Sequence, residues 1–319
     1  MLGYCAVPTI FPKDDMTAAR RTRTSLASLG VVLGTLITFA VPSVVGAAVP
    51  HTTSAFYLVI GASDSLGVQP SPSSPGGQRT DHGYANDVVA AEAAQGVTLD
   101  MTQIGCPGET TFTMMNGGDH CYSAPATQLS TAIDFLSAHR SDTGLVTLDL
   151  GFNNLLPCLV HGALDATCVD NLLPQVRLDM TTILTALKAA AGPNVTFIGI
   201  DHFNPYLASA VGGPSGRIIA SDSVHPLTAL NRTLYDVYGS FGIAVAHAAA
   251  AFHLADSDPV RTSPGLRVPG DALHVCALTY MCRAQHAPNF HPDSRGYRII
   301  AGAILAALGP RWPTVDPTR

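Results

Sequence analysis

The stretch Phe56-Tyr57-Leu58-Val59-Ile60-Gly61 decides the fold class, because a run of apolar, aromatic and β-branched residues stops at a glycine. Such a run is typical of a strand that is buried on both faces, as strands of parallel sheets are. Similar runs occur at residues 145–150 and 195–200, and a further strand is expected at residues 97–104. The sequence therefore predicts a mostly parallel central sheet.

Helical patterns alternate with these strands. Helices are expected at residues 84–94, 128–139, 176–191, 230–252 and 298–308. The segment 69–78 is rich in Pro, Ser and Gly and is expected to be a loop. Strands that alternate with helices predict a sheet that is covered by helices on both faces. No internal repeat or charge block divides the chain, so we expect a single domain at residues 49–319.

The composition excludes some classes of protein. Hydrophobic residues make up 47% of the chain and charged residues 13%, which argues against disorder and allows a large buried core. The formal net charge is −6. Nucleic-acid binders need a basic surface that exchanges with phosphate counterions, so we expect no nucleic-acid partner.

Residues 1–48 are expected to be an N-terminal extension and signal peptide. Arg20, Arg21 and Arg23 precede an uncharged, largely apolar stretch that ends in the small residues of segment 45–48, as signal peptidase requires. A retained membrane anchor is the alternative, since roughly 20 apolar residues can span a bilayer. Pro42 and the small residues favour cleavage. We therefore expect a secreted protein with no stable membrane span after signal removal.

The cysteines support export. Six of the seven cysteines lie after residue 48, and an even number in an exported protein favours disulfides. A metal site is disfavoured, because no C-x-x-C or H-E-x-x-H pattern is present. Pairing each cysteine with its nearest neighbour gives the shortest loops, and it predicts the bonds Cys106–Cys121, Cys158–Cys168 and Cys276–Cys282.

Small and polar residues follow the expected strands. Gly-Ala-Ser-Asp-Ser-Leu-Gly occupies residues 61–67, Ile-Gly-Cys-Pro-Gly-Glu-Thr-Thr residues 104–111, and Gly-Phe-Asn-Asn residues 151–154. Asn-Phe-His-Pro-Asp follows at residues 289–293, just before the last expected helix. In open α/β sheets, ligands bind at the carboxyl ends of the strands. A serine, a glycine, an asparagine and a histidine therefore come from four segments to one expected site.

These four segments, in this order and at these spacings, resemble the sequence blocks of the GDSL/SGNH serine hydrolases, in particular secreted actinobacterial-type esterases and lipases. The resemblance covers nearly all of residues 56–308. It implies a three-layer α/β/α sandwich with a mostly parallel, flavodoxin-like central sheet. It also implies a serine esterase or lipase that acts on a small-molecule or lipid ester and needs no metal or organic cofactor.

The matching positions suit the chemistry of ester hydrolysis, which needs a nucleophile, a base and donors for the oxyanion. Ser63 matches the nucleophile, and His291 is the expected general base because it lies in a proline-stiffened loop before the last helix. The oxyanion hole is expected from the N–H groups of Ser63 and Gly108 and the side chain of Asn153. Ser65 is a rival nucleophile, but alignment of the block on its two glycines selects Ser63.

The third member of the triad is left open. The family has an aspartate two or three residues before the histidine, where this chain has Asn289 and Pro288. Asn289 can orient the ring through its side-chain oxygen, or a backbone carbonyl in segment 282–288 can do so. Asn154 also departs from the family's aspartate and is expected to support its loop. Asp64 is expected to cap the turn or the following helix, and Asp293 to cap the last helix.

We hypothesise a secreted carboxylic ester hydrolase that acts through an acyl-enzyme on Ser63. A catalytically weak or inactive exported binding protein on the same scaffold is the alternative, because of Asn154 and Asn289. An α/β-hydrolase is disfavoured, since its Gly-x-Ser-x-Gly elbow lies on a strand deep in the chain, whereas here residue 65 is serine and the motif falls on the first strand. The sequence leaves acyl length and oligomeric state open. Apolar residues near the blocks are expected to line the acyl pocket, namely Leu66, Phe152, Leu155, Leu156 and Phe290.

Overall fold

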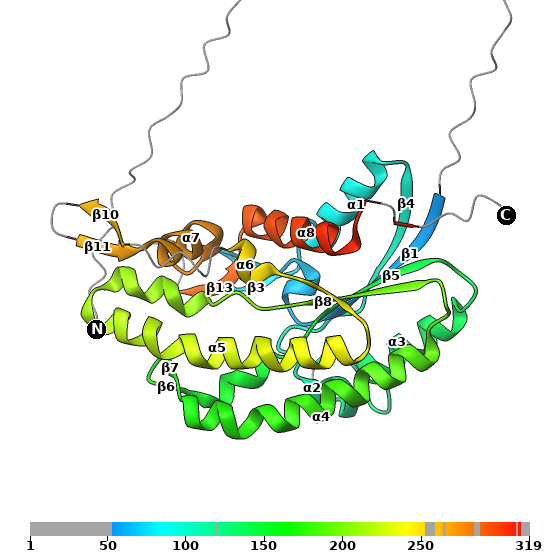
Figure 1. Cartoon of the computed structure of the whole chain (residues 1–319), viewed down its shortest axis with the longest axis horizontal. Coiled ribbons are helices and arrows are strands. Elements are labelled where there is room, and N and C mark those ends of the chain that lie inside the picture. The colour runs from blue at the N-terminus through cyan, green and yellow to red at the C-terminus, as the bar shows by residue number, and fades with distance from the viewer. Residues whose placement is uncertain are drawn as a thin grey trace, which may run out of the picture. The chain divides into compact units, whose positions relative to one another are not determined.

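Five parallel strands form the central sheet in the order β4–β1–β5–β8–β9 (Figure 1). The computed structural model describes residues 53–118, 120–252, 259–263, 266–283, 288–310 and 312–313. In order along the chain the arrangement is 2-1-3-4-5, which is the flavodoxin-like order. The predicted mostly parallel sheet is therefore confirmed. Its strands are β1 (Thr53–Gly61), β4 (Val97–Gln103), β5 (Gly144–Asp149), β8 (Val195–Ile200) and β9 (Ala244–Ala246).

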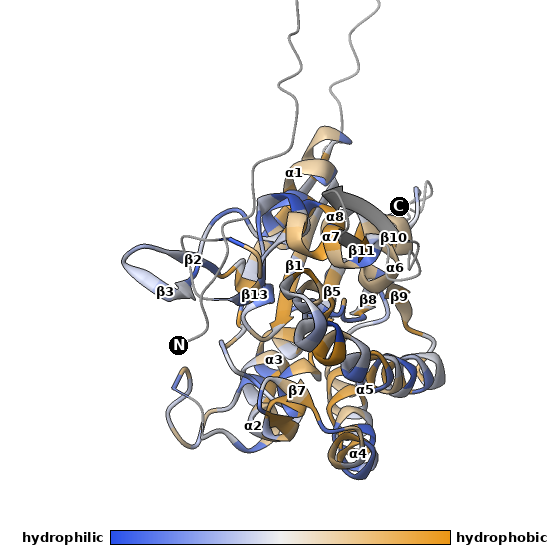
Figure 2. Ribbon diagram, turned by 90° about the vertical axis from the view of Figure 1, so that its left-hand side faces the viewer, coloured by the Kyte–Doolittle hydropathy of each residue, from blue (hydrophilic) through white to orange (hydrophobic). Residues whose placement is uncertain are grey.

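Helices cover both faces of this sheet, as Figures 1 and 2 show. Two helices lie on one face, namely α1 (Tyr84–Ala94) and α8 (Ser294–Leu308). Three lie on the other, namely α3 (Gln128–Ala138), α4 (Ala166–Ala190) and α5 (Pro214–Ser240). The predicted three-layer α/β/α architecture is confirmed.

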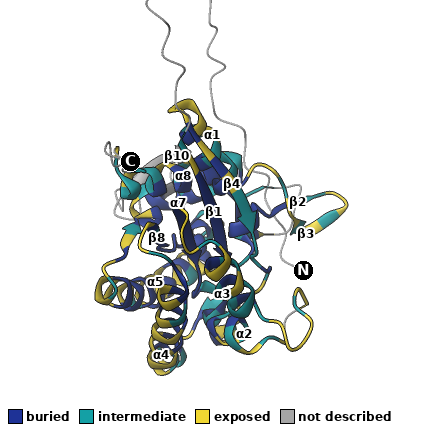
Figure 3. Ribbon diagram, turned by 90° about the vertical axis from the view of Figure 1, so that its right-hand side faces the viewer, coloured by how far each residue is buried: buried dark blue, intermediate teal, exposed yellow. Residues whose placement is uncertain are grey.

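The alternation of side chains along β1 builds both layers of the core. Phe56, Leu58 and Ile60 pack toward α3, α4 and α5. Tyr57 and Val59 pack toward α1 and α8, because successive side chains of a strand point to opposite faces. Figure 3 shows the result: β1 is largely buried, the edge strand β4 is only partly buried, and exposed residues lie on the outer faces of α4 and α5.

Short elements surround the carboxyl edge of the sheet. Two-stranded hairpins pair β2 with β3, β6 with β7, β10 with β11 and β12 with β13. The hairpin strands are β2 (Gln69–Ser71), β3 (Ser74–Gln78), β6 (Leu159–Val160), β7 (Ala163–Leu164), β10 (Pro259–Ser263), β11 (Leu266–Pro269), β12 (Thr279–Tyr280) and β13 (Asn289–Pro292). The remaining helices are η1 (Asp64–Leu66), α2 (Thr111–Asn116), η2 (Phe152–Cys158), η3 (Pro205–Gly212), α6 (Ala248–Ala251) and α7 (Gly270–Leu278).

Three expectations for local structure are wrong. The helix expected at residues 230–252 is α5, which begins at Pro214 and ends at Ser240, and β9 follows it. Parallel pairing with β8 overrides the helix propensity of this alanine-rich run. Residues 69–78 form the β2–β3 hairpin rather than a loop. The helix expected at residues 176–191 already begins at Ala166, where the side chain of Asp165 accepts a hydrogen bond from the N–H of Cys168.

The structure contains the three disulfides that nearest-neighbour pairing predicts: Cys106–Cys121, Cys158–Cys168 and Cys276–Cys282. Among the described residues, no helix is both long and apolar enough to cross a membrane. The expected extension and signal peptide, residues 1–48, lie outside the described residues.

Replacing Gly61 by alanine should destabilise the sheet edge. Gly61 has a φ of +150°, and a Cβ there would lie 2.5 Å from the carbonyl oxygen of Asp149. Overpacking of this kind costs about 1–3 kcal/mol, and we expect at least that loss in the free energy of unfolding, measured with urea. Gly302→Ala in α8 is the control, because no atom lies within 4 Å of its added Cβ. It should raise the free energy of unfolding by about 0.5–1 kcal/mol. Equal stability of the two variants would contradict the packing described here.

Candidate active site

Ser63 lies in a tight turn directly after β1. The N–H groups of Leu66 and Val68 donate to its carbonyl oxygen at 3.1 and 3.2 Å, and 8% of the residue is exposed. Ser65 is fully buried, and its hydroxyl donates to the carbonyl oxygen of Ala62 at 2.6 Å. Ser65 is thus occupied inside the turn, and this geometry supports Ser63 as the nucleophile.

A buried glutamine joins this turn to the loop of Gly108. The Oε1 atom of Gln128, at the start of α3, accepts from the N–H of Gly61 at 2.8 Å. Its Nε2 atom donates to the carbonyl oxygen of Gly61 at 3.0 Å and to Glu109 Oε2 at 2.7 Å. This side chain and the hydrogen bond from the N–H of Cys106 to the carbonyl oxygen of Gly61, at 3.0 Å, together set the spacing between the end of β1 and the loop 106–110. Sequence reasoning missed Gln128, which lies outside the four motif segments.

Three donors suited to an oxyanion lie on these loops. The Nδ2 atom of Asn153 donates one hydrogen to the carbonyl oxygen of Glu109 at 3.0 Å, which leaves its second hydrogen available. Within the part of the chain that the structure describes, no group accepts a hydrogen bond from the N–H of Ser63 or of Gly108. Gly108 has a φ of +85°, a backbone conformation that favours glycine.

Asn154 supports its loop through Thr111. Its Oδ1 atom accepts from the N–H of Thr111 at 3.1 Å, and its Nδ2 atom donates to the Thr111 hydroxyl at 2.9 Å. That hydroxyl donates in turn to Asp179 at 2.7 Å. An asparagine is well suited here, since it offers both a donor and an acceptor to one threonine.

Asn289 fixes the tautomer of His291. Both residues lie on β13, and Asn289 Oδ1 is 2.7 Å from His291 Nδ1 and 3.0 Å from the His291 N–H. Asn289 Nδ2 donates to the carbonyl oxygens of Pro75 and Gly76, each at 3.3 Å, which leaves Oδ1 facing the ring. The ring must then carry its proton on Nδ1, so Nε2 presents a lone pair.

The imidazole of His291 is neutral over a wide pH range. It is 8% exposed, and burial lowers its pKa to about 4. Its Nε2 atom is buried and has no hydrogen-bond partner among the described residues. A neutral ring with a free Nε2 lone pair has the form that a general base needs.

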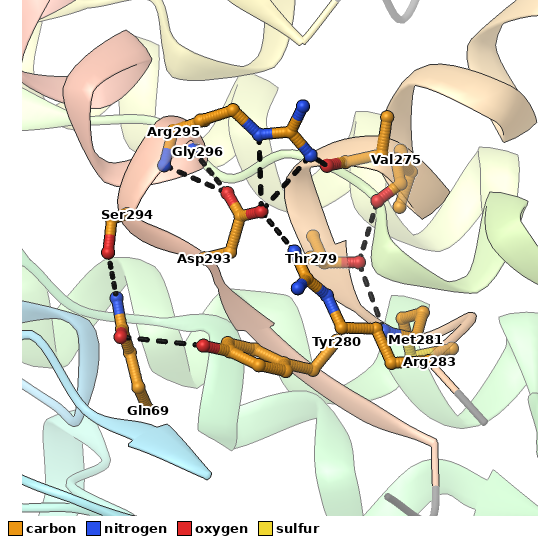
Figure 4. A network of polar contacts seen from close by, with 11 residues as sticks. Gln69, Val275, Thr279, Tyr280, Met281, Arg283, Asp293, Ser294, Arg295 and Gly296 are labelled. Carbon is orange, nitrogen blue, oxygen red and sulfur yellow. Dashed lines mark hydrogen bonds and ion pairs between the residues drawn. The ribbon is translucent and has the colours of Figure 1, made fainter. Parts of the chain in front are cut away.

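An ionic cluster anchors the end of β13 (Figure 4). Asp293 accepts from the N–H groups of Arg295 and Gly296 at 2.9 and 3.0 Å, so it caps α8 as the sequence predicts. Its other carboxylate oxygen pairs with the guanidinium groups of Arg283 and Arg295. His291 therefore lies two residues before a firmly held helix start.

Ser63 and His291 have no direct hydrogen bond in this structure. Their segments are joined by other contacts: the hydroxyl of Tyr297 in α8 donates to the carbonyl oxygen of Val68 at 2.8 Å. Gln69 Nε2 also donates to Ser294 Oγ at 3.2 Å (Figure 4). Catalytic hydrogen bonds are often long without substrate and tighten in the complex.

A cavity of about 30 Å³ lies beside Ser63, between the turns that follow β1, β5 and β8. Ser63 and Asn153 line it, whereas Gly108 and His291 do not. Two of the apolar residues expected to line an acyl pocket, Phe152 and Phe290, line this cavity. The other three do not: Leu66 and Leu155 are buried in the interior, and Leu156 is not part of the cavity wall.

The cavity also has a polar wall, which we define as Asp64, Asp149 and His202. Sequence reasoning missed this role. Asp64 was expected to cap the turn or the following helix, but its Oδ1 atom instead lies 3.1 Å from the hydroxyl of Tyr297. His202 is buried and contacts the carbonyl oxygen of Leu150 at 2.8 Å. Asp149, the acid that ends the buried strand β5, is a sequence signal that could have indicated this wall.

One group of possible metal ligands occurs among the described residues, namely Cys106, His120 and Cys121. The two cysteines form a disulfide with each other, so the group offers no thiolate. This composition does not suit a metal site.

No protein-family model and no curated protein matches the chain. Similar solved structures include a phospholipase A1 from Streptomyces albidoflavus NA297, with 15% identity, a TM-score of 0.49 and coverage of 79% of this chain and 99% of that one. An extracellular lipase from Streptomyces rimosus has 17% identity, a TM-score of 0.48 and coverage of 79% and 99%. A variant of an acetyl xylan esterase from Geobacillus stearothermophilus has 14% identity, a TM-score of 0.47 and coverage of 81% and 97%. The function proposed below rests on the residues of this chain.

His291 should titrate near pH 4 in the NMR spectrum of its ring protons, because burial disfavours its charged form. In Asn289→Asp, a carboxylate replaces the neutral oxygen beside Nδ1, so the midpoint should move upward. A His291→Gln spectrum assigns the signal. An unchanged midpoint in Asn289→Asp would show that residue 289 does not face the ring.

Proposed function

We propose that the chain is a secreted serine ester hydrolase of the GDSL/SGNH type, with Ser63 as nucleophile and His291 as general base. The observation that carries the proposal is the state of His291: Asn289 holds its Nδ1 atom at 2.7 Å, and its Nε2 atom is buried without a partner among the described residues. A base prepared in this way, on a segment joined to the turn of Ser63, supports acyl transfer.

In the proposed reaction, Ser63 Oγ attacks the carbonyl carbon of the ester while His291 Nε2 takes the hydroxyl proton. The tetrahedral intermediate collapses, the carbon–oxygen bond to the alcohol breaks, and the alcohol leaves with the proton from Nε2. Water then attacks the acyl-enzyme, gives its proton to Nε2 and releases the acid, and the proton returns to Ser63 Oγ. Asn289 stabilises the imidazolium through Oδ1 but adds no charge.

The proposed oxyanion hole comprises the N–H groups of Ser63 and Gly108 and the free N–H of Asn153. The support is that these donors lie on loops joined to one another by Gln128 and Glu109. Preorganised donors of this kind stabilise the charge that develops on the carbonyl oxygen.

Export is part of the proposal. Three disulfides among the described residues are typical of proteins that fold in an oxidising compartment. Residues 1–48 would supply the signal, and the N-terminal sequence of the protein recovered from the medium tests this.

Ser63→Ala and His291→Ala should each lower kcat/KM for 4-nitrophenyl acetate by about 10³ or more, because each removes a participant in proton transfer. A fluorophosphonate probe should label the wild type at residue 63 and should not label Ser63→Ala. Ser65→Ala is the matched control: it loses a buried hydrogen bond but should keep most of the activity. An unlabelled, inactive wild type would favour the alternative, an exported binding protein on this scaffold.

Asn153→Ala should lower kcat by about 10²–10³ with little change in KM, as the loss of one oxyanion donor does. Asn194→Ala is the control, because Asn194 is exposed just before β8 and should have no effect. If KM rises while kcat stays constant, Asn153 binds the ground state and is no oxyanion donor.

A further inference from the structure

The cavity beside Ser63 combines two kinds of surface. Phe152, Phe203 and Phe290 contribute rings, whereas the polar wall contributes two carboxyl groups and an imidazole. Its volume is about 30 Å³. A water molecule needs roughly 10–15 Å³ of such space, so the cavity holds only a group of a few heavy atoms.

The polar wall offers acceptors that lack donors. His202 Nε2 contacts the carbonyl oxygen of Leu150 at 2.8 Å, and a carbonyl oxygen only accepts, so Nε2 carries the ring proton. Burial lowers the pKa of His202, which keeps the ring neutral and makes Nδ1 an acceptor. Nδ1 lies 3.7 Å from Asp149 Oδ1, beyond hydrogen-bond distance. The other oxygen, Asp149 Oδ2, is buried without a partner among the described residues.

Among the described residues, Asp64 makes no hydrogen bond to His202 Nδ1 or to Asp149 Oδ2. Tyr297 has one hydroxyl hydrogen and lies 2.8 Å from the carbonyl oxygen of Val68, which leaves its oxygen facing Asp64 at 3.1 Å. Burial and the nearby charge of Asp149 raise the pKa of Asp64, and burial raises that of Asp149. Within the part of the chain that the structure describes, no hydrogen bond joins Asp64 to Asp149, so Asp149 Oδ2 still lacks a donor.

We propose that the polar wall selects the substrate: Asp149 and His202 bind a hydroxyl or amino group on a short acyl chain attached to Ser63. This inference rests on the proposed ester hydrolysis. A ligand O–H or N–H group satisfies the acceptors, and a methyl group of the same size leaves them unpaired. The rings of Phe152 and Phe290 enclose the remaining carbon atoms.

The size of the cavity assigns the selected group to the acyl side of a nitrophenyl ester. On the measure by which one water needs roughly 10–15 Å³, a cavity of about 30 Å³ holds about two or three water-sized groups. That is too few for a nitrophenyl ring but suits a two-carbon acyl group with one polar atom. Ser63 and Asn153 both line the cavity, so a carbonyl carbon bound to Ser63 places its substituent there.

The test compares the 4-nitrophenyl esters of propionic, hydroxyacetic and aminoacetic acid. Each kcat/KM is divided by the rate of the same ester with hydroxide, which removes intrinsic reactivity. The wild type should favour a donor-bearing ester over propionate by about tenfold or more. Faster aminoacetate indicates that the wall binds an ammonium group, and faster hydroxyacetate indicates that it binds a hydroxyl.

Asp149→Asn should reduce this preference several-fold, because it replaces an acceptor oxygen with an NH₂ group. Glu92→Gln is the matched control, since Glu92 is a buried acid on α1 outside the cavity, and it should leave the preference unchanged. If Asp149→Asn does not fold, the preference of the wild type decides alone. Equal normalised rates in the wild type, or an unchanged preference in a folded Asp149→Asn, would overturn the inference while ester hydrolysis stands. The absence of hydrolysis and of fluorophosphonate labelling would instead overturn the proposed function.

Discussion

The site depends on the buried amide of Gln128. It exchanges two hydrogen bonds with Gly61 and donates a third to Glu109, so the end of β1 and the loop of Gly108 keep one spacing. The ladder of backbone hydrogen bonds ends just past β1, where the N–H of Ala62 donates to the carbonyl oxygen of Asp149 at 3.1 Å and the N–H of Cys106 donates to that of Gly61 at 3.0 Å. The side chain of Gln128, which comes from helix α3, adds two further hydrogen bonds to Gly61 at this end of the strand. Since it is fully buried, loss of the amide would leave the N–H of Gly61 without its hydrogen-bond acceptor.

The two polar atoms of the Asn289 side chain have partners in different parts of the fold. Its Oδ1 atom serves the ring of His291, and its Nδ2 atom serves the carbonyl oxygens of Pro75 and Gly76 in the β2–β3 hairpin. An aspartate would hold the ring more strongly but would turn an oxygen toward two carbonyl oxygens. Asparagine therefore joins the hairpin to His291 and places no charge beside the imidazole. This explains in physical terms why the chain departs from the aspartate of the family it resembles.

The sequence predicted the elements that have one strong local signal. The strand expected at residues 195–200 matches β8, because a largely apolar run marks it. The helix expected at residues 84–94 matches α1, because its helical pattern ends just before a glycine. The β2–β3 hairpin was missed, because its Pro, Ser and Gly residues are typical of a loop. Asn289, which is distant in sequence, donates hydrogen bonds to its carbonyl oxygens. The site was predictable where motifs lie, as for Ser63 and Asn153, which both line the cavity. Phe203 and His202 reach the cavity only through the turn after β8, which carries no motif, so tertiary structure alone reveals them.

Helix α8 relates the serine to the histidine without a direct contact between them. Its residue Tyr297 binds the turn of Ser63 through Val68 and contacts Asp64. Its start is capped by Asp293, two residues after His291, and the two arginine side chains hold that cap. Both segments are thus attached within the first turn of one helix, where backbone hydrogen bonds permit little displacement. The relative position of Ser63 and His291 is then set by the packing of α8 on the sheet, and it does not require a hydrogen bond between the two side chains.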